Sequence, residues 1–141
     1  MKQHSFGKCQ TTIDLDATAK WYAQYKGWHC DCGHCRNFLA LGSHKALPER
    51  TLAVLAEFSI PPEKPTYVCT LDWNAESLLY QCSYRIAGSI TVAALPDGTE
   101  DGETGRVIHE PYPYGAPGFP EPHFDIEFFI TLPWALDEPQ S

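Results

Sequence analysis

Basic residues are scarce in this chain. It holds 10 lysines and arginines against 18 aspartates and glutamates, which gives a formal net charge of -8. That balance disfavours general affinity for phosphates, so we expect no direct binding of nucleic acid. The sequence also lacks an apolar run of the roughly 20 residues that span a bilayer, and its start lacks the apolar stretch of a signal peptide. We therefore expect a cytoplasmic protein that does not contact a membrane.

Several motifs of common enzyme classes are absent as well. The sequence contains no G-x-S-x-G, no phosphate-binding P-loop and no dinucleotide-binding glycine fingerprint. Its length of 141 residues predicts a single domain, residues 1–141. A chain of that size buries enough surface to fold without disulfides or metals.

The acidic charge is concentrated in the second half of the chain. Residues 1–71 carry six acidic and eight basic residues, whereas residues 72–141 carry twelve acidic residues and only two arginines. Such asymmetry is typical of a solvated acidic surface that keeps a protein soluble. The alternative is an acidic inhibitor or nucleic-acid mimic that binds a partner with a basic surface.

The first half of the chain predicts helices. Helical spacing relates Ala17, Trp21, Tyr25 and Trp28, and Asp14 or Asp16 can cap the start while Gly27 suits the end. The same stretch also alternates well enough for an aromatic strand, and we favour the helix. The first ten residues predict no regular structure.

Two more short helices are expected before the pattern changes. Cys35 to Gly42 place apolar residues on one face, and Pro48 is typical of the first residue of a helix. The prolines of segment 60–65 end this helical part, because proline cannot continue a helix. Thr66 to Leu71 then predict a short strand.

Alternation with period two dominates the second half. Residues 80–92 predict a long strand bent at Gly88, and residues 124–132 predict another. Between them lies a loop rich in proline and glycine, with a turn at Asp97-Gly98 and a short strand around Arg106 to Glu110. Helices first and strands later predict an α+β fold, in which N-terminal helices with a cysteine-rich turn pack on a C-terminal antiparallel sheet.

A cysteine cluster carries the only clear chemical signature. Cys30, Cys32 and Cys35 lie within six residues, and the last two form a C-x-x-C pair that can place two thiolates on one ion. In a reducing compartment this density favours a metal or redox site over structural disulfides. Thiolate and imidazole suit tetrahedral Zn²⁺ best, so we predict a zinc-binding protein with a binding or interaction role rather than an enzyme.

The fourth ligand is left open by the sequence. His34 is the nearest histidine, although its place between two ligand cysteines hinders it from turning inward. The other candidates are Cys9, His29, Cys69, Cys82, His109 and His123.

A thiol redox protein or thiol enzyme is the rival interpretation of the same residues. In that case Cys32 and Cys35 form a reversible disulfide, and the start of the following helix activates one thiol.

A second polar group is weaker evidence for a site. His123, Asp125 and Glu127 project from one face of the last predicted strand. Imidazole and carboxylates together suit a hydrolytic or metal site. We favour the simpler interpretation, in which they form the polar outer face of a half-exposed strand.

The cysteine segment resembles a family of small, uncharacterised bacterial proteins. The family pattern W-x-C-x-C-x-x-C-x-N-F is matched by Trp28, Cys30, Cys32, Cys35, Asn37 and Phe38. A closing P-W-x-L-D-E is matched by Pro133, Trp134, Leu136, Asp137 and Glu138. The resemblance implies that the cluster acts as a unit, and it implies no activity.

Overall fold

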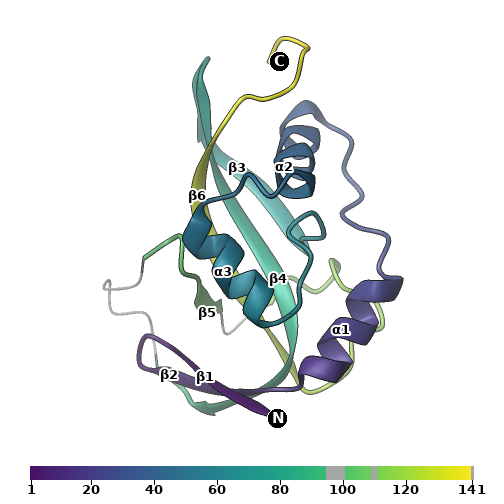
Figure 1. Ribbon diagram of the computed structural model, residues 1–141, viewed down its shortest axis with the longest axis vertical. Coiled ribbons are helices and arrows are strands. Elements are labelled where there is room, and N and C mark those ends of the chain that lie inside the picture. Colours follow the sequence, from purple (N-terminus) through teal and green to yellow (C-terminus); the bar gives the residue numbers. More distant parts are fainter. Residues whose placement is uncertain (95–100, 109–110, 141) are drawn as a thin grey trace.

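The computed structural model describes residues 1–94, 101–108 and 111–140. The helices in these ranges are α1 (Leu15–Gln24), α2 (Gly33–Ser43) and α3 (Glu49–Glu57). The strands are β1 (Lys2–Phe6), β2 (Cys9–Ile13), β3 (Tyr67–Trp73), β4 (Ser77–Val92), β5 (Arg106–Ile108) and β6 (His123–Pro133). The mixed α+β fold predicted from the sequence is confirmed, with the helices preceding most of the sheet (Figure 1).

Strand β4 organises the sheet. The strand order is β1-β2-β4-β6-β5, with β3 also paired to β4, and the paired strands run antiparallel. One edge of β4 pairs with β6 from Ser77 to Ala87. Its other edge pairs first with β3 and then, from Gly88 onward, with β2. The long central strand therefore joins all parts of the sheet.

Gly88 marks the point where β4 changes partners. Its φ is +154°, and a Cβ at this position would lie 2.2 Å from the backbone oxygen of Thr12 in β2. Only glycine allows this approach without a shift of one strand. The predicted bend at Gly88 is thus explained by the arrival of β2.

The N-terminal hairpin corrects one expectation. The first ten residues were expected to be irregular, but β1 and β2 pair from Lys2↔Ile13 to Phe6↔Cys9. The burial of hydrophobic side chains explains why these residues form a hairpin, since Phe6 and Ile13 are 5% and 0% exposed. The hairpin is held by tertiary packing that a short polar segment does not reveal.

Helix caps agree with the sequence at the start of α1 and differ at its end. Asp14 is the N-cap, and its carboxylate accepts a hydrogen bond from the backbone N–H of Ala17. The helix ends at Gln24, three residues before Gly27. Pro48 proves to be the N-cap of α3 rather than its first residue.

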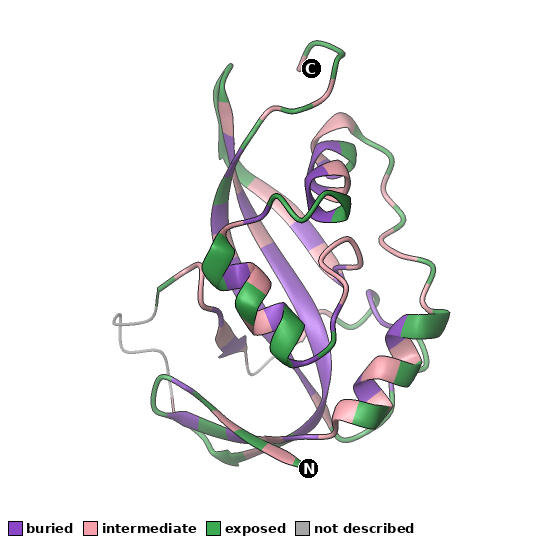
Figure 2. Cartoon of the chain, in the orientation of Figure 1, coloured by how far each residue is buried: buried purple, intermediate pink, exposed green. Residues whose placement is uncertain are grey.

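A buried cluster holds these elements together. It includes residues from the three helices and from each strand named above, among them Tyr22, Phe38, Leu55, Tyr80 and Phe128. Figure 2 shows burial along β4 and on the helix faces turned toward it.

None of the helices in the described part of the chain has the length and apolarity needed to cross a bilayer. The predicted turn at Asp97-Gly98 and the end of the strand expected up to Glu110 lie outside the described residues.

Candidate metal centre

The cysteine cluster lies where an extended segment enters α2. Cys32 is the N-cap of α2, in an extended conformation, and its Sγ accepts a hydrogen bond from the backbone N–H of Cys35 at 3.4 Å. Cys35 follows in the first helical turn, and Cys30 comes two residues before the cap. The three Sγ atoms lie within 4.8 Å of one another. Helix capping thus turns a C-x-C-x-x-C spacing into a group that can hold a metal ion.

The three thiols differ in exposure. Cys35 is buried, Cys30 is half-buried and Cys32 is exposed. Solvent can therefore reach the cluster from the side of Cys32, while α2 and its neighbours enclose the opposite side. A metal ion can enter this site without unfolding the protein.

Protonation of the cluster is asymmetric. Burial raises the pKa of Cys35 to about 12, and hydrogen bonds with Cys30 and Cys32 act in the same direction. Burial also opposes ionisation of Cys32, but hydrogen bonds from the backbone of Cys35 and from the Cys30 thiol outweigh it and lower its pKa. Cys32 is thus the first of this pair to become a thiolate.

Trp28 lies beside the buried end of the cluster. Its indole N–H is buried and has no hydrogen-bond partner among the described residues. The same N–H is close enough to Cys35 to favour the thiolate form and to oppose part of the rise in pKa caused by burial. A thiolate at Cys35 would therefore relieve an unsatisfied buried donor.

Asn37 joins α2 to the C-terminal segment. Its amide NH₂ donates to the backbone oxygen of Pro133 at 3.0 Å and to the hydroxyl of Tyr80 at 3.2 Å. Its amide oxygen accepts from the backbone N–H of Ala135 at 2.7 Å. The hydroxyl of Tyr80 in turn donates to the backbone oxygen of His34 at 2.6 Å. This fully buried amide fixes the first turn of α2, and with it the position of Cys35.

A surface ion pair adds a second link between the same segments. The guanidinium of Arg36 pairs with the Glu138 carboxylate, and its Nε donates to the backbone oxygen of Asp31 at 2.9 Å. The indole N–H of Trp134 donates to the backbone oxygen of Glu138 at 2.7 Å. The two motifs that carry the family resemblance are therefore in direct contact, although about a hundred residues separate them.

His34 does not join the three thiols. Its Nδ1 lies 3.1 Å from the hydroxyl of Thr70 in β3, and its ring packs edge-on against Trp73 at 5.2 Å. Its Nε2 is buried without a partner in the described structure. Among the residues that the structure describes, the group of close ligand atoms consists of the three cysteines. His34 therefore contacts β3, whereas the Sγ atoms of the three cysteines group with one another.

The other candidate ligands are also distributed elsewhere. Cys9 and Cys82 are buried in β2 and β4, and Cys69 lies half-buried in β3. His29 is exposed beside the cluster, and His123 Nδ1 lies 3.0 Å from the backbone oxygen of Pro120. His109 lies outside the described residues. Among described residues the centre thus offers three protein ligands.

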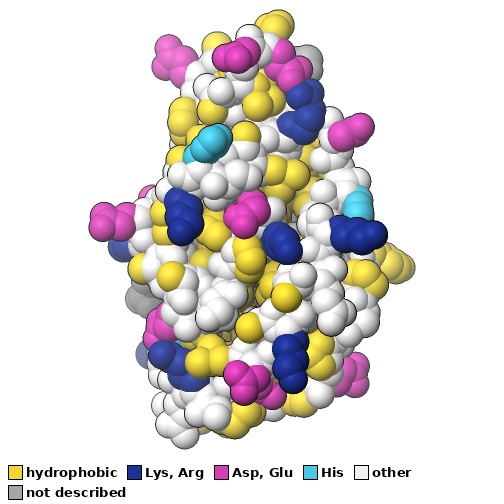
Figure 3. All heavy atoms as spheres, turned by 45° about the vertical axis from the view of Figure 1, so that its right-hand side comes forward, with side chains coloured by type: hydrophobic (Ala, Val, Ile, Leu, Met, Phe, Trp, Pro, Cys, Tyr) yellow, Lys and Arg dark blue, Asp and Glu magenta, His cyan; other side chains and the backbone are white. Residues whose placement is uncertain are grey.

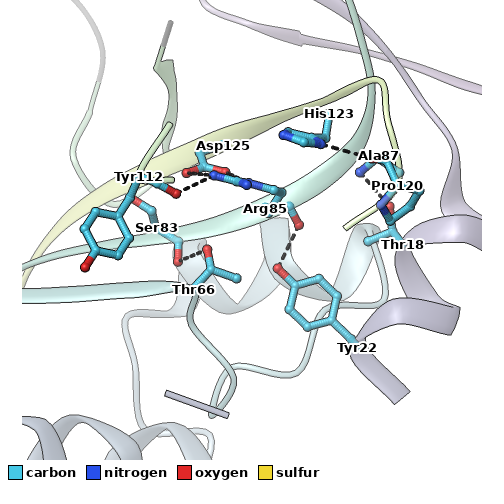
Figure 4. A network of polar contacts seen from close by, with 10 residues as sticks. All are labelled: Thr18, Tyr22, Thr66, Ser83, Arg85, Ala87, Tyr112, Pro120, His123 and Asp125. Atoms are coloured by element: carbon cyan, nitrogen blue, oxygen red, sulfur yellow. Dashed lines mark hydrogen bonds and ion pairs between the residues drawn. The ribbon is translucent and has the colours of Figure 1, made fainter. Parts of the chain in front are cut away.

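The polar face of β6 corrects another interpretation. Asp125 and Glu127 were expected on an exposed outer face, but they are 0% and 5% exposed. Arg85 forms a bidentate pair with Asp125 at 2.6 and 3.3 Å and donates to the backbone oxygen of Tyr112 at 2.7 Å (Figure 4). Glu127 accepts from Arg106 at 2.8 Å and from Gln81 at 2.6 Å. The partners of these carboxylates are thus arginine and glutamine side chains, and His123 is not among the hydrogen-bond partners described for them.

Sequence reasoning missed Arg85 and Asn37. Arg85 is a single arginine inside an apolar alternating strand, and its cross-strand neighbour is Asp125. That combination is a usable signal for a buried ion pair. Asn37 gave no signal beyond its place in the family pattern, because its partners are backbone atoms of a distant segment.

Comparison of the chain with protein-family models, with curated proteins and with solved structures finds no match. The resemblance at the two motifs therefore stays a prediction, and function has to be argued from the site itself.

Proposed function

We propose that this protein binds one Zn²⁺ ion through the thiolates of Cys30, Cys32 and Cys35. The observation that carries the proposal is the approach of the three Sγ atoms to within 4.8 Å of one another. Zn–S bonds of about 2.3 Å in a tetrahedral shell place sulfur atoms roughly 3.8 Å apart. Closing the group around an ion thus requires a contraction of about 1 Å at most, in a segment where one thiol is exposed.

The ion would serve as a link between two parts of the chain. Cys30 precedes α2, whereas Cys35 belongs to its first turn and to the buried core. A shared ion ties the extended segment after α1 to the helix. Three protein ligands leave one tetrahedral position for water or for a donor from outside the described residues.

The chemistry of the surroundings suits thiolates. The backbone N–H of Cys35 donates to Cys32, and the free indole N–H of Trp28 lies near Cys35. Donors of this kind orient the ligands of a metal and stabilise their charge. They favour the thiolate form of Cys32 and offset part of the effect of burial on Cys35.

Elemental analysis of protein purified without added metal tests the proposal. We expect about one zinc per chain, and the loss of most of it in Cys30→Ser, Cys32→Ser and Cys35→Ser. Cys69→Ser is the matched control, because it removes a half-buried thiol outside the group. Cobalt substitution should add a thiolate-to-metal absorption band that disappears in the same three variants.

The proposal fails if the wild-type protein holds no stoichiometric zinc and all three thiols react freely with an alkylating reagent. It also fails if Cys69→Ser loses zinc as completely as the three cluster variants while remaining folded.

A thiol redox function is the second candidate, favoured by the asymmetry of the C-x-x-C pair. Cys32 is exposed with a lowered pKa, whereas the pKa of buried Cys35 is raised. In this function Cys32 and Cys35 together give up two electrons to a disulfide substrate, such as oxidised glutathione, and become bonded to each other. Alkylation at Cys32 distinguishes the two functions: a zinc-held thiolate is protected until chelator is added, and a redox thiolate is reactive without it.

Part of the acidic charge of the second half is neutralised within the protein. Five of its carboxylates form ion pairs with arginine, namely Asp101, Glu103, Asp125, Glu127 and Glu138. A partner with a basic surface therefore stays a prediction, which salt-dependent binding would support.

A further inference from the structure

An aromatic groove lies beside the cysteine cluster, and Trp28 belongs to both: it lines one cavity, and its indole N–H lies near Cys35. Its walls are the end of α1 with residues 25–29 on one side and residues 112–118 on the other. Two adjoining cavities of about 390 and 340 Å³ share Tyr25, His29 and Pro117. Each is large enough for a small molecule. We propose that this groove binds a small planar aromatic anion.

The two walls are fastened to each other, so the groove is formed before any ligand arrives. The indole N–H of Trp21 donates across it to the backbone oxygen of Pro117 at 3.1 Å. Trp21 also stacks on Tyr25, with ring centroids 4.4 Å apart, and the Tyr25 hydroxyl donates to the backbone oxygen of Pro65 at 3.0 Å. Preformed walls reduce the ordering cost of binding.

A close backbone contact positions the second wall. A Cβ on Gly115 would lie 1.7 Å from the backbone oxygen of Thr66, the residue directly before β3. The loop can approach the sheet this closely only because residue 115 is glycine. Any larger side chain has to displace the loop and, with it, the tyrosines on either side.

Aromatic rings line the cavity nearer to the cysteines. Tyr112 contacts Trp28 and Tyr114, with ring centroids 6.1 and 5.8 Å apart. Tyr114 is 80% exposed, so its ring is open to solvent beside the cavity that it lines. On the side of the molecule that includes α1, hydrophobic side chains lie among lysine, arginine, aspartate and glutamate side chains (Figure 3). An exposed ring at the rim of an aromatic groove is suited to stack on a planar ligand.

Charge decides which kind of planar ligand fits. The cavities are lined by Lys26 and His29, both exposed, and by no aspartate or glutamate. No carboxylate among the described residues forms an ion pair with Lys26. A cage for an organic cation usually adds an acidic group to its rings, whereas this groove adds an ammonium. The net charge of the protein is -8, so the positive charge of Lys26 at the groove is a local exception, and it favours an anionic ligand.

Three probes separate the chemical requirements. Indole-3-acetate has the ring and the negative charge, tryptamine has the same ring with a positive charge, and cyclohexaneacetate has the charge without an aromatic face. We expect indole-3-acetate to bind at least about tenfold more tightly than either of the others in calorimetric or NMR titrations. Equal binding of the three probes, or no binding of indole-3-acetate at millimolar concentration, would overturn the proposal.

Matched variants place the binding in the groove. Lys26→Glu and Tyr114→Ala should each weaken indole-3-acetate binding about fivefold or more, since they remove the charge and the exposed ring. Lys20→Glu makes the same charge change on α1, outside the residues that line the cavities, and should leave affinity within about twofold. Gly115→Ala should weaken binding while circular dichroism shows the fold retained.

Unchanged affinity in Lys26→Glu and Tyr114→Ala would exclude this groove. The zinc content of the same variants is measured in parallel, so that a failure of the groove proposal is distinguished from a failure of the zinc proposal.

Discussion

The sheet and the cysteine turn are stabilised in opposite ways. The middle of β4 is buried on both faces, from Cys82 to Gly88, and its one arginine is neutralised inside the protein by Asp125. The turn from Cys30 to Cys35 has an exposed thiol, and the indole N–H beside it has no partner in the described structure. The charged group described in the sheet has its counter-charge inside the protein, whereas the turn holds three thiols that could bind a metal ion and a buried donor without a partner in the described structure. Variants of each region test whether stability and metal binding divide between the two regions in the same way.

Breaking the buried ion pair of the sheet should have the largest effect. Asp125→Ala leaves Arg85, whose side chain is 5% exposed, without its counter-charge. Removing one partner of such a pair costs about 3–5 kcal/mol. Urea unfolding should show this loss in the free energy of unfolding. The double variant Arg85→Met/Asp125→Leu should recover much of it, and a single variant as stable as wild type would show that the pair is dispensable.

Asn37 is the point where the two regions meet, so its loss should affect both. Asn37→Ala removes three hydrogen bonds and leaves the backbone groups of Pro133 and Ala135 without this partner. We expect a loss of about 2–3 kcal/mol in unfolding free energy, because buried groups lose their partners. Zinc affinity should fall as well, since the first turn of α2 carries Cys35. Asn74→Ala, in an exposed turn, should cost less and leave zinc binding unchanged; equal effects would contradict the linking role of Asn37.

The sequence predicted elements whose signal is local and missed those that depend on distant partners. Two features could be predicted because each depends on a few neighbouring residues. They are the cluster of Cys30, Cys32 and Cys35 and the helix cap at Asp14. The β1–β2 hairpin was not, because Phe6 and Ile13 bury against residues far along the chain. The burial of Asp125 was missed for the same reason, since it depends on Arg85 and on the loop around Tyr112. The groove has no sequence signal beyond the tyrosines and prolines of that loop.

Removing the metal should affect the turn and spare the sheet. With chelator present, hydrogen exchange should accelerate in residues 28–36 and stay unchanged in the core of β4, because only the turn uses the ion. Lowering the pH should act like chelator: the ion must displace the Cys35 proton, whose pKa is about 12, so affinity falls as the proton concentration rises. Hydrogen exchange followed by mass spectrometry with and without chelator at pH 7 checks the first effect, and zinc titrations at pH 7 and 5 check the second. Faster exchange across β4 would show that the metal supports the whole fold.

The surface link between the regions should have the smallest effect. Glu138→Gln removes the partner of Arg36, and both side chains are largely exposed, at 46% and 43%. Solvent screens such pairs, so the urea midpoint should stay within experimental error. Arg36 would keep its hydrogen bond to the backbone of Asp31, and Asn37 would still hold the C-terminal segment. Zinc affinity should also stay within about twofold at 0.15 M salt, where charges beyond about 8 Å are largely screened. A large loss of zinc in Glu138→Gln would contradict this expectation. It would mean that the Arg36–Glu138 ion pair, rather than the buried amide of Asn37, holds the cysteine turn in place.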